Sequence, residues 1–468
     1  MDKLQLIHLD TRQKTVFEPR DPQHVTLYVC GPTVYDRVHL GNARPNVVFD
    51  VLYRVLKQQF GKVTYVRNIT DVDDKIIQRA KKLGQDIDAL TQDTIAQFHK
   101  DMDALHILPP TIEPRATAHI PQMIEMIQKL VAGGHAYVAE SHVLFDVSSD
   151  AAYGSLSNRD IDQLLAGARV DVAPYKKNPT DFVLWKPAQE TEPGWESPWG
   201  RGRPGWHIEC SAMSAAHLGA SFDIHGGGRD LIFPHHENEA AQSRCANGAE
   251  TFAKYWMHCG MLTVSGQKMS KSLGNFISME TALENTPGEV LRYALMMTHY
   301  RHPLDWTPKT LKNARIGLDR LYGGIKAAGD LSDFPEQAPS KAVLSALYDD
   351  LNTPRALSAL YEITKQIHSV PDKEKAALGA QLKAGAAYLG LLNQTASAWF
   401  QGDAGNESVG ELTAAVIDVE IQARLDARRS KDFARADEIR GSLEEKGIVL
   451  EDTPTGTTWR RKPMARPS

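Results

Sequence analysis

Residues 25–66 constrain the fold of this chain more than any other segment, because they pass from a strand pattern to a helix pattern and back. The run Val25–Val29 is apolar and rich in β-forming residues, and Gly31-Pro32 ends it, which predicts a buried strand. From Gly41 onward the apolar residues recur at helical spacing, and a second β-rich run follows at Lys62–Val66. This order and spacing predict a parallel βαβ unit.

The turn between the first strand and the helix carries two different chemical groups. Cys30 offers a thiolate that a soft metal ion could bind. The helix start near His39–Asn42 offers free N–H groups and the positive end of a helix dipole, which together favour an anion. Pro45 suits the first turn of this helix, where its missing N–H costs nothing. An ordinary loop with a buried cysteine and a surface histidine explains the same residues. This segment alone therefore does not distinguish a metal and anion site from an ordinary loop.

The bulk properties narrow the class of protein. At 468 residues the chain should form two to four domains of roughly 100–200 residues each. No apolar run approaches the roughly 20 residues of a membrane helix, and the first residues lack a signal-peptide pattern. We therefore expect a cytoplasmic protein that contacts no membrane. Its net charge of −5 means that a nucleic-acid partner would have to use local basic patches.

The cysteines favour metal binding or core packing over disulfides. There are four, which is few for a chain of this length, and they are scattered. They are Cys30, Cys210, Cys245 and Cys259.

The order of strand-like and helix-like segments predicts an α/β fold. We expect a Rossmann-like parallel-sheet domain with an insertion, followed by an α-helical bundle and a small C-terminal α/β module. In that module we expect one charged helix from Ile421 to Gly447. The expected divisions are the first half of the Rossmann-like domain (1–114), a connective insertion (115–204), the second half (205–262), a lysine-containing loop region (263–310), the helical bundle (311–392), a linker (393–410) and the C-terminal module (411–468).

A candidate metal site joins residues from three segments. On a helix, His235 and Glu239 are four residues apart and share one face. With Cys30 and Cys210 they form a donor set that suits zinc better than magnesium or calcium. His236 is one position off that face and ranks below His235. The alternative is a polar helix start and two unrelated core cysteines, because Cys30 and Cys210 lie far apart in the sequence.

Two further loops could contact a substrate. Lys268, Ser270 and Lys271 lie in a short turn between two glycines, where two ammonium groups could neutralise a departing pyrophosphate. A solvated lysine loop is the alternative. The glycines at 226–228 permit close backbone approach, and Asp230 could pair with an ammonium, although a tight turn explains these glycines equally well.

These residues resemble known signatures. The segment His39-Leu40-Gly41-Asn42 resembles the "HIGH" signature of class I aminoacyl-tRNA synthetases, and Lys268-Met269-Ser270-Lys271-Ser272 matches their "KMSKS" signature. Over essentially the whole chain, further segments resemble the cysteinyl-tRNA synthetase family. These segments are Cys30–Thr33, Trp206–Cys210, Phe233–Glu239, Asp349–Pro354 and Glu451–Trp459.

The resemblance implies a chemical activity and a set of site residues. It implies activation of cysteine with ATP to cysteinyl-adenylate and pyrophosphate, then transfer to the 3′-terminal ribose of tRNA(Cys). The partners are then tRNA(Cys), L-cysteine and ATP with Mg²⁺, and we expect a monomer. One zinc ion that also binds the substrate thiolate is implied at Cys30, Cys210, His235 and Glu239. The implied catalytic residues are His39, Asn42, Lys268 and Lys271. The implied ATP-binding set adds Gly41, His258 and Ser270. The candidates for the amino-acid pocket are Thr33, Thr70, Trp206 and Asp230. Those for tRNA contact are Arg428, Arg435, Trp459 and Arg460. The resemblance also makes 263–310 the KMSKS loop and stem-contact region, and 411–468 an anticodon-binding module.

Two rival functions fit part of the pattern. A cysteine ligase that joins activated cysteine to an amino sugar, as in mycothiol synthesis, resembles a synthetase without the C-terminal part. A non-catalytic zinc-dependent RNA-binding protein would not need His39, Lys268 or Lys271. The arginines of the charged C-terminal helix favour the synthetase, because their natural use is contact with tRNA. For Cys245 and Cys259 we expect core packing.

Overall fold

The computed structural model describes residues 3–8, 13–158, 174–248, 251–270, 273–329, 334–401, 413–453 and 456–461. The chain divides into two compact units. The first comprises residues 1–314, 341–358 and 388–391, and the second comprises 315–340, 359–387 and 392–468. Within the described residues, no helix has both the length and the apolar character needed to cross a bilayer.

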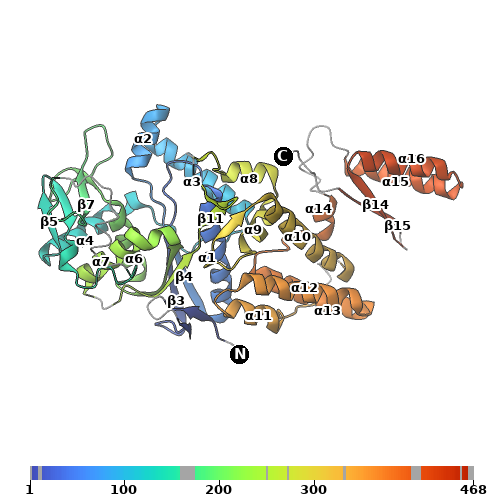
Figure 1. The fold of residues 1–468 in the computed structure, drawn as a ribbon, viewed down its shortest axis with the longest axis horizontal. Coiled ribbons are helices and arrows are strands. Elements are labelled where there is room, and N and C mark those ends of the chain that lie inside the picture. Colours follow the sequence, from blue (N-terminus) through green and yellow to red (C-terminus); the bar gives the residue numbers. More distant parts are fainter. Residues whose placement is uncertain are drawn as a thin grey trace. The chain divides into compact units, whose positions relative to one another are not determined.

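A four-stranded parallel sheet forms the centre of the first unit (Figure 1). Its strands, in spatial order, are β10 (Ala253–Cys259), β9 (Phe222–Gly228), β3 (His24–Val29) and β4 (Lys62–Arg67). The chain leaves β3 in one direction toward β4, whereas β9 and β10 lie on its other side. This reversal of strand order next to β3 is where open α/β sheets bind ligands, beyond the carboxyl ends of the strands.

Helix α1 (Leu40–Gln59) connects β3 to β4, which confirms the predicted strand–helix–strand unit. Its apolar stripe, including Val47, Val51 and Val55, is fully buried. The helix begins at Leu40, where the His39 N–H donates to Asn42 Oδ1 at 3.3 Å. Pro45 therefore lies inside the helix and not in its first turn as predicted, and it cannot donate a helical hydrogen bond to Gly41.

The connective insertion contains an antiparallel sheet. Its strands, in spatial order, are β5 (Ala136–Ala139), β6 (His142–Phe145), β7 (Phe182–Pro187) and β8 (Gly202–Pro204). Figure 1 shows this sheet beside α4 (Ile120–Ala132), which packs against α6 (Trp206–Leu218) and α7 (Glu237–Asn247). One hydrophobic core, which includes Tyr28, Trp185 and Met213, is continuous from the parallel sheet into the insertion.

The first unit contains further short helices, strands and helices besides these two sheets. The short helical segments are η1 (Ala116–His119), η2 (Val147–Ser149), η3 (Arg229–Leu231) and η4 (Ile232–His236). The strands are β1 (Gln5–Ile7), β2 (Lys14–Val16), β11 (Leu262–Val264), β12 (Gln267–Lys268) and β13 (Leu304–Trp306). The helices are α2 (Asp74–Leu83), α3 (Ile87–Ala104), α8 (Met279–Asn285), α9 (Gly288–Met296) and α11 (Lys341–Tyr348).

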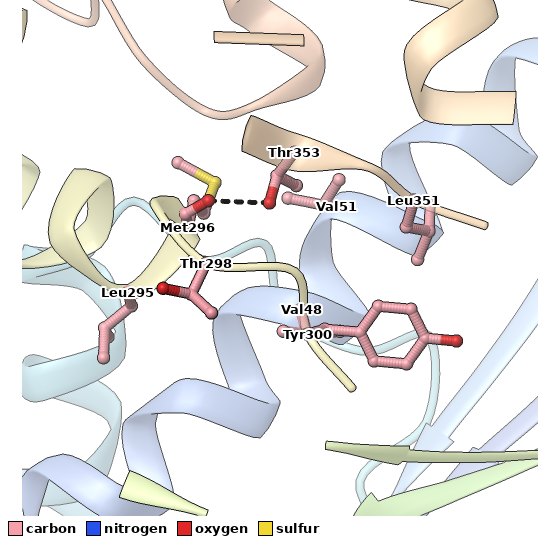
Figure 2. Close-up of a pocket in the computed structure, with 8 residues that line it drawn as sticks. All are labelled: Val48, Val51, Leu295, Met296, Thr298, Tyr300, Leu351 and Thr353. Carbon is pink, nitrogen blue, oxygen red and sulfur yellow. Dashed lines mark hydrogen bonds between the residues drawn. The ribbon is translucent and has the colours of Figure 1, made fainter. Parts of the chain in front are cut away.

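A small cavity lies between α1 and the segment from Leu351 to Thr353, where α12 (Thr353–Ser369) begins (Figure 2). Val48 and Val51 line it from α1, and Thr353 Oγ1 donates to the carbonyl of Met296 at 2.8 Å. Its volume of about 10 Å³ is barely that of one water molecule, so it is a packing void and not a ligand site.

Helices dominate the second unit. They include most of α10 (Pro308–Ala328), α12 (Thr353–Ser369) and α13 (Asp372–Tyr388), and all of α14 (Ala396–Gln401). A Cβ atom at Gly324 of α10 would lie 3.0 Å from Thr364 of α12, so glycine allows these two helices to approach closely. The segment expected to be a linker, 393–410, contains α14, and residues 402–410 lie outside the described part of the chain.

The C-terminal module has two helices where the sequence predicted one. Helix α15 (Ala414–Arg429) ends before Lys431, whose φ of 62° is left-handed. Asp432 then caps α16 (Phe433–Glu445) by accepting from the Arg435 N–H. The hairpin β14 (Ile448–Thr453) and β15 (Gly456–Arg461) follows, and Ile417, Ile439 and Trp459 share a small core.

Arg424 anchors this hairpin to α15. Its guanidinium is buried and donates two hydrogen bonds of 2.9 Å to Asp452, which lowers the pKa of that carboxyl well below its usual range. The pair is partly exposed on the aspartate side, so we expect Asp452→Asn to destabilise the module by about 1–2 kcal/mol at pH 7. Hydrogen exchange of the β14 amides measures this loss.

The loss should fade in acid. Because the folded-state pKa of Asp452 is depressed, the pair stabilises above the unfolded-state pKa near about 3.9, and this contribution is lost as the pH falls further. An equal effect of Asp452→Asn at pH 7 and well below pH 3.9 would contradict the assignment.

Candidate metal and nucleotide site

Four side chains meet beyond the carboxyl edge of the parallel sheet. Cys30 follows β3, and Cys210 lies in α6. His235 lies in η4, and Glu239 lies in the first turn of α7, which follows it. Their donor atoms all lie within 4.8 Å of one another. The Sγ atoms of Cys30 and Cys210 are 3.7 Å apart, and His235 Nε2 lies 3.0 Å from Glu239 Oε1. The structure thus brings together the four residues that the sequence proposed as metal ligands.

A second group shares two of these residues. Cys30, His225, His236 and Glu239 also have donor atoms within 4.8 Å of one another. His225 Nε2 lies 2.9 Å from Glu239 Oε2, and its Nδ1 lies 3.2 Å from the carbonyl of Tyr28. His225 therefore orients the Glu239 carboxylate, in the way that outer partners orient metal ligands. The sequence analysis missed His225, although a histidine within a buried strand pattern just before three glycines was an available signal.

His236 points to a different neighbour. Its Nδ1 lies 2.8 Å from Nε2 of His258, and both rings are buried. The predicted ATP-binding residue His258 thus lies against this histidine, at the carboxyl end of β10. Burial, together with the nearby histidines His225 and His258, lowers the pKa of His236 well below its usual value. The ring of His236 is therefore neutral at pH 7.

The cluster is electrostatically coupled. Burial and the neighbouring Cys210 raise the pKa of the Cys30 thiol. The hydrogen bond from Cys30 lowers the pKa of Cys210 to about 6 despite its burial. Burial opposes the charge on His235, but Glu239 and Cys210 outweigh it and raise the pKa of His235 to about 10. The cluster therefore stabilises anionic donors that are held close to a bound proton, and a cation could replace that proton.

The proposed amino-acid pocket adjoins this cluster. The Trp206 ring stacks on His235 at 4.2 Å between ring centroids and is 38% exposed. Thr33 and Thr70 lie on adjacent extended segments, and Thr70 Oγ1 donates to Glu209 at 2.8 Å. Glu209 is buried, and burial raises its pKa well above the usual value.

Asp230 is exposed just after β9, at the same edge of the sheet. Sequence analysis did not single out Glu209, because one acidic residue in a helix carries no signal of its own.

The two signature segments are in direct contact. His39 precedes α1, and its ring meets Phe276 edge-on at 5.3 Å. The Leu40 N–H donates to the carbonyl of Ile277 at 3.1 Å. A Cβ at Gly41 would lie 3.1 Å from the methyl carbon of Met269, so the glycine lets the second signature lie directly on the first.

The lysine loop is partly described. Lys268 is exposed in β12, and the Ser270 N–H donates to Asn275 Oδ1 at 2.8 Å. Asn42 is exposed near the start of α1. Lys271 lies outside the described residues.

Comparison with known proteins assigns this arrangement to a family. A family model described as tRNA synthetases class I (C) catalytic domain matches residues 16–316. A DALR domain model matches residues 342–393, and a cysteinyl-tRNA ligase anticodon binding domain model matches residues 412–460. The chain belongs to the cysteinyl-tRNA synthetase family.

Curated relatives of this synthetase family match over nearly their full length. A cysteine–tRNA ligase of Rhodospirillum rubrum is 57% identical over 453 residues, which cover 96% of this chain and 98% of that protein. A cysteine–tRNA ligase of Caulobacter vibrioides is 55% identical over 460 residues, which cover 97% of this chain and 98% of the relative.

Solved structures of other synthetases share the fold. Methionyl-tRNA synthetase of Mycobacterium tuberculosis, bound by methionyl-adenylate, superposes with a TM-score of 0.56 at 14% identity, covering 84% of this chain and 96% of its own. LeuRS of Agrobacterium radiobacter, in a ternary complex with tRNA and LeuAMS, gives a TM-score of 0.57 at 11% identity, covering 82% and 87%. The expected α/β fold is thereby confirmed.

The residues expected to contact tRNA all lie in the C-terminal module of this synthetase-family chain. Arg428 donates to Asp452 at 3.1 Å, and Arg435 pairs with Glu438 on an exposed face of α16. Trp459 is buried and donates through Nε1 to Asp418 at 3.0 Å, so its ring belongs to the module's core. The backbone of Arg460 lies in β15, and its side chain is outside the described part.

Arg44 links α1 to the strands that lead into the second signature. It lies in α1, is completely buried, and donates to the carbonyls of Gly260 at 2.8 Å, Met261 at 3.3 Å and His299 at 3.3 Å. Gly260 and Met261 lead into β11, which pairs with β12 and so carries Lys268. Arg44 therefore fixes the base of the lysine-bearing ribbon against the helix that begins beside His39.

We expect Arg44→Met to slow amino-acid activation by about 10²-fold, because a misplacement of about 1 Å at reacting groups costs that much. The affinity for cysteine should change little, since Arg44 donates its hydrogen bonds to the carbonyls of Gly260, Met261 and His299, which are not part of the metal cluster. Pyrophosphate-exchange kinetics and cysteine binding measure the two quantities separately. Loss of cysteine binding in parallel with the rate would show that Arg44 is merely structural.

Proposed function

We propose that the chain is a cysteine–tRNA ligase that activates cysteine with ATP and transfers it to tRNA(Cys). The observation that carries the proposal is the convergence of Cys30, Cys210, His235 and Glu239 at the carboxyl edge of the sheet, the edge at which α1 also begins after β3. An amino-acid site of this chemistry next to an anion-binding helix start suits activation of a thiol-containing amino acid. Membership of the family supports the same activity.

We propose that the cation at this cluster is zinc, one per chain. Two thiolates, an imidazole and a carboxylate form a donor set that zinc accepts and that magnesium and calcium do not favour. When bound, zinc would supply a Lewis acid that prefers a thiolate to a hydroxyl and lowers the pKa of a thiol ligand. Cys30, Cys210, His235 and Glu239 would hold it, and His225 would keep the Glu239 carboxylate in position.

Selection of cysteine over serine follows from the residues around this cluster. The two amino acids differ by one atom, and a shape-based pocket separates such near-isosteres only modestly. A site built around one specific polar bond can reject the wrong substrate by roughly 10⁴–10⁵-fold without editing. Thr33, Thr70, Trp206 and Asp230 would complete the pocket, with Asp230 available to pair with the substrate ammonium.

Activation needs positioning and charge stabilisation more than a covalent nucleophile. The cysteine carboxylate attacks the α-phosphorus of ATP, and the bond to pyrophosphate breaks. His39, Gly41, Asn42, His258 and Ser270 would line the nucleotide site. Lys268 and Lys271 would neutralise the pyrophosphate that leaves with Mg²⁺, and a ribose hydroxyl of tRNA then displaces AMP.

The proposed activity assigns a role to most segments of the chain. The parallel-sheet domain (1–114 and 205–262) would activate cysteine, and 263–310 would be the KMSKS loop and stem-contact region. The insertion is 115–204, the helical bundle is 311–392, and 393–410 is the linker. The module 411–468 would bind the anticodon, through Arg428, Arg435, Trp459 and Arg460. We also propose that the protein acts in the cytoplasm as a monomer.

One pair of assays tests this function. Cysteine-dependent exchange between ATP and pyrophosphate should be fast, exchange with serine should be slower by about 10⁴-fold, and tRNA(Cys) should be charged. Exchange without charging of tRNA would favour the amino-sugar ligase. Absence of exchange would favour an RNA-binding protein. The match of residues 412–460 to an anticodon binding domain favours neither alternative.

A further inference from the structure

Asn68 is a buried amide that contacts both the metal cluster and the proposed amino-acid pocket. It directly follows β4, which ends at Arg67, and it is 1% exposed. Burying an amide is costly unless the amide is hydrogen-bonded, so its partners show what this side chain holds in place. The sequence analysis did not single it out, and the proposed activity does not use it so far.

The amide oxygen of Asn68 holds the loop of Cys30. Asn68 Oδ1 accepts a hydrogen bond of 2.9 Å from the N–H of Gly31, the residue after Cys30. The same oxygen lies 3.7 Å from Sγ of Cys210, the second sulfur of the cluster. A Cβ atom at Gly31 would lie 1.6 Å from the carbonyl oxygen of Asn68, so only glycine allows the two backbones to approach this closely. One side chain therefore contacts the segments that carry both sulfurs.

The amide nitrogen of Asn68 orients the hydroxyl of Thr70. Asn68 Nδ2 donates to Thr70 Oγ1 at 3.3 Å, and this hydroxyl donates in turn to Glu209 at 2.8 Å. The amide can take only one orientation, because the Gly31 N–H is a donor and requires the oxygen on its side. A hydroxyl oxygen has two lone pairs, and Asn68 engages one of them, so the other can accept from a substrate ammonium.

We propose that Asn68 is a positioning residue that fixes the proposed metal ligands relative to the amino-acid pocket. Its oxygen holds the loop of Cys30, and its nitrogen keeps the Thr70 hydroxyl oriented as an acceptor for the substrate ammonium. One buried amide would then place the thiol and the ammonium of the substrate relative to each other. The inference rests on the proposed function and extends it to a residue outside the predicted site.

Metal affinity tests the role of the amide oxygen. We expect Asn68→Ala to bind Zn²⁺ about 10-fold more weakly than the wild type in competition with a chromophoric chelator, because loss of a partner that orients a metal ligand costs about 10–100-fold. Asn68→Asp keeps an oxygen for the Gly31 N–H and should bind Zn²⁺ at least as tightly as the wild type. Wild-type affinity in Asn68→Ala, or an equal loss in Asn68→Asp, would overturn the proposal.

A double-variant cycle tests the role of the amide nitrogen. The dissociation constant of L-cysteine is measured by calorimetry on Zn²⁺-saturated Asn68→Ala, Thr70→Val and the double variant. Each single change should raise it by about 10-fold, roughly the effect of one hydrogen bond to a charged group. The double variant should exceed Thr70→Val by less than the increase that Asn68→Ala causes alone, because Asn68 acts on the ammonium through Thr70. Increases that multiply to about 100-fold, or no increase in Asn68→Ala, contradict this role.

Two controls separate positioning from a general loss of structure. The KM for ATP in pyrophosphate exchange should stay at its wild-type value in Asn68→Ala, and a parallel rise in this KM would show a merely structural role. If Asn68→Ala does not fold, Asn68→Leu, which keeps the volume of the side chain, enters both measurements with the same expectations. Failure of the proposed function appears separately, as absent cysteine-dependent exchange in the wild type, and the chelator competition does not depend on it.

Discussion

Cys210→Ser is expected to lose its metal and its cysteine-dependent activation together. The Cys210 thiol is buried, lies 3.7 Å from Cys30, and has a pKa lowered to about 6, so it is the sulfur most ready to bind a cation. Changing an outer partner of a metal ligand already costs 10–100-fold in affinity or activity. Replacing a ligand should therefore lower cysteine-dependent exchange by more than about 10²-fold, with metal content near zero.

Cys245→Ser is the matched control for this experiment. Cys245 lies in α7 with Glu239 but outside both groups of potential metal donors. Elemental analysis of the two variants should show metal retained in Cys245→Ser alone. Full metal content in Cys210→Ser would refute the proposed ligand set, whatever its activity.

Arg292→Met is expected to destabilise the first unit by about 3–5 kcal/mol. Arg292 and Asp50 form an ion pair in which both side chains are completely buried. The guanidinium also donates to the carbonyls of Leu389 at 2.6 Å and Leu105 at 3.0 Å. Its removal leaves a buried carboxylate with less compensation and two carbonyls without this donor. Chemical denaturation followed by fluorescence measures the free energy of unfolding.

Two variants make the Arg292 result interpretable. Arg355→Met removes an arginine that is 58% exposed at its contact with Asp349, and should cost less than about 1 kcal/mol. The double variant Arg292→Met, Asp50→Asn removes the uncompensated charge and should recover part of the loss. A single Arg292→Met variant as stable as Arg355→Met would contradict this account of the buried pair.

The sequence predicts the centre of the fold well where periodicity is strong. The apolar runs of β3 and β4 and the stripe of α1 each have one clear period, and all three elements form. Exact starts and stops depend on local hydrogen bonds that periodicity does not contain. The bond from the His39 N–H to Asn42 starts α1 early enough to place Pro45 inside it. The left-handed Lys431 and the cap at Asp432 divide the C-terminal helix, although its charge pattern continues through the break.

The candidate site shows what a sequence can and cannot specify. Cys30, Cys210, His235 and Glu239 were proposed from donor chemistry and family resemblance, and the parallel sheet brings them to one edge. The outer contacts were not predicted, because they depend on how separate elements pack against one another in the fold. The pairing of β9 with β3 places His225 beside the carbonyl of Tyr28, and Glu209 meets Thr70 across 139 positions.

Direct contact between the substrate thiolate and the metal can be observed spectroscopically. In enzyme loaded with Co²⁺ at the cluster of Cys30, Cys210, His235 and Glu239, L-cysteine should increase the sulfur-to-cobalt charge-transfer absorption, whereas L-serine should leave it unchanged. The increase should saturate at the cysteine concentration that saturates pyrophosphate exchange. An unchanged spectrum at saturating cysteine, while exchange proceeds, would contradict the claim that the metal selects the amino acid.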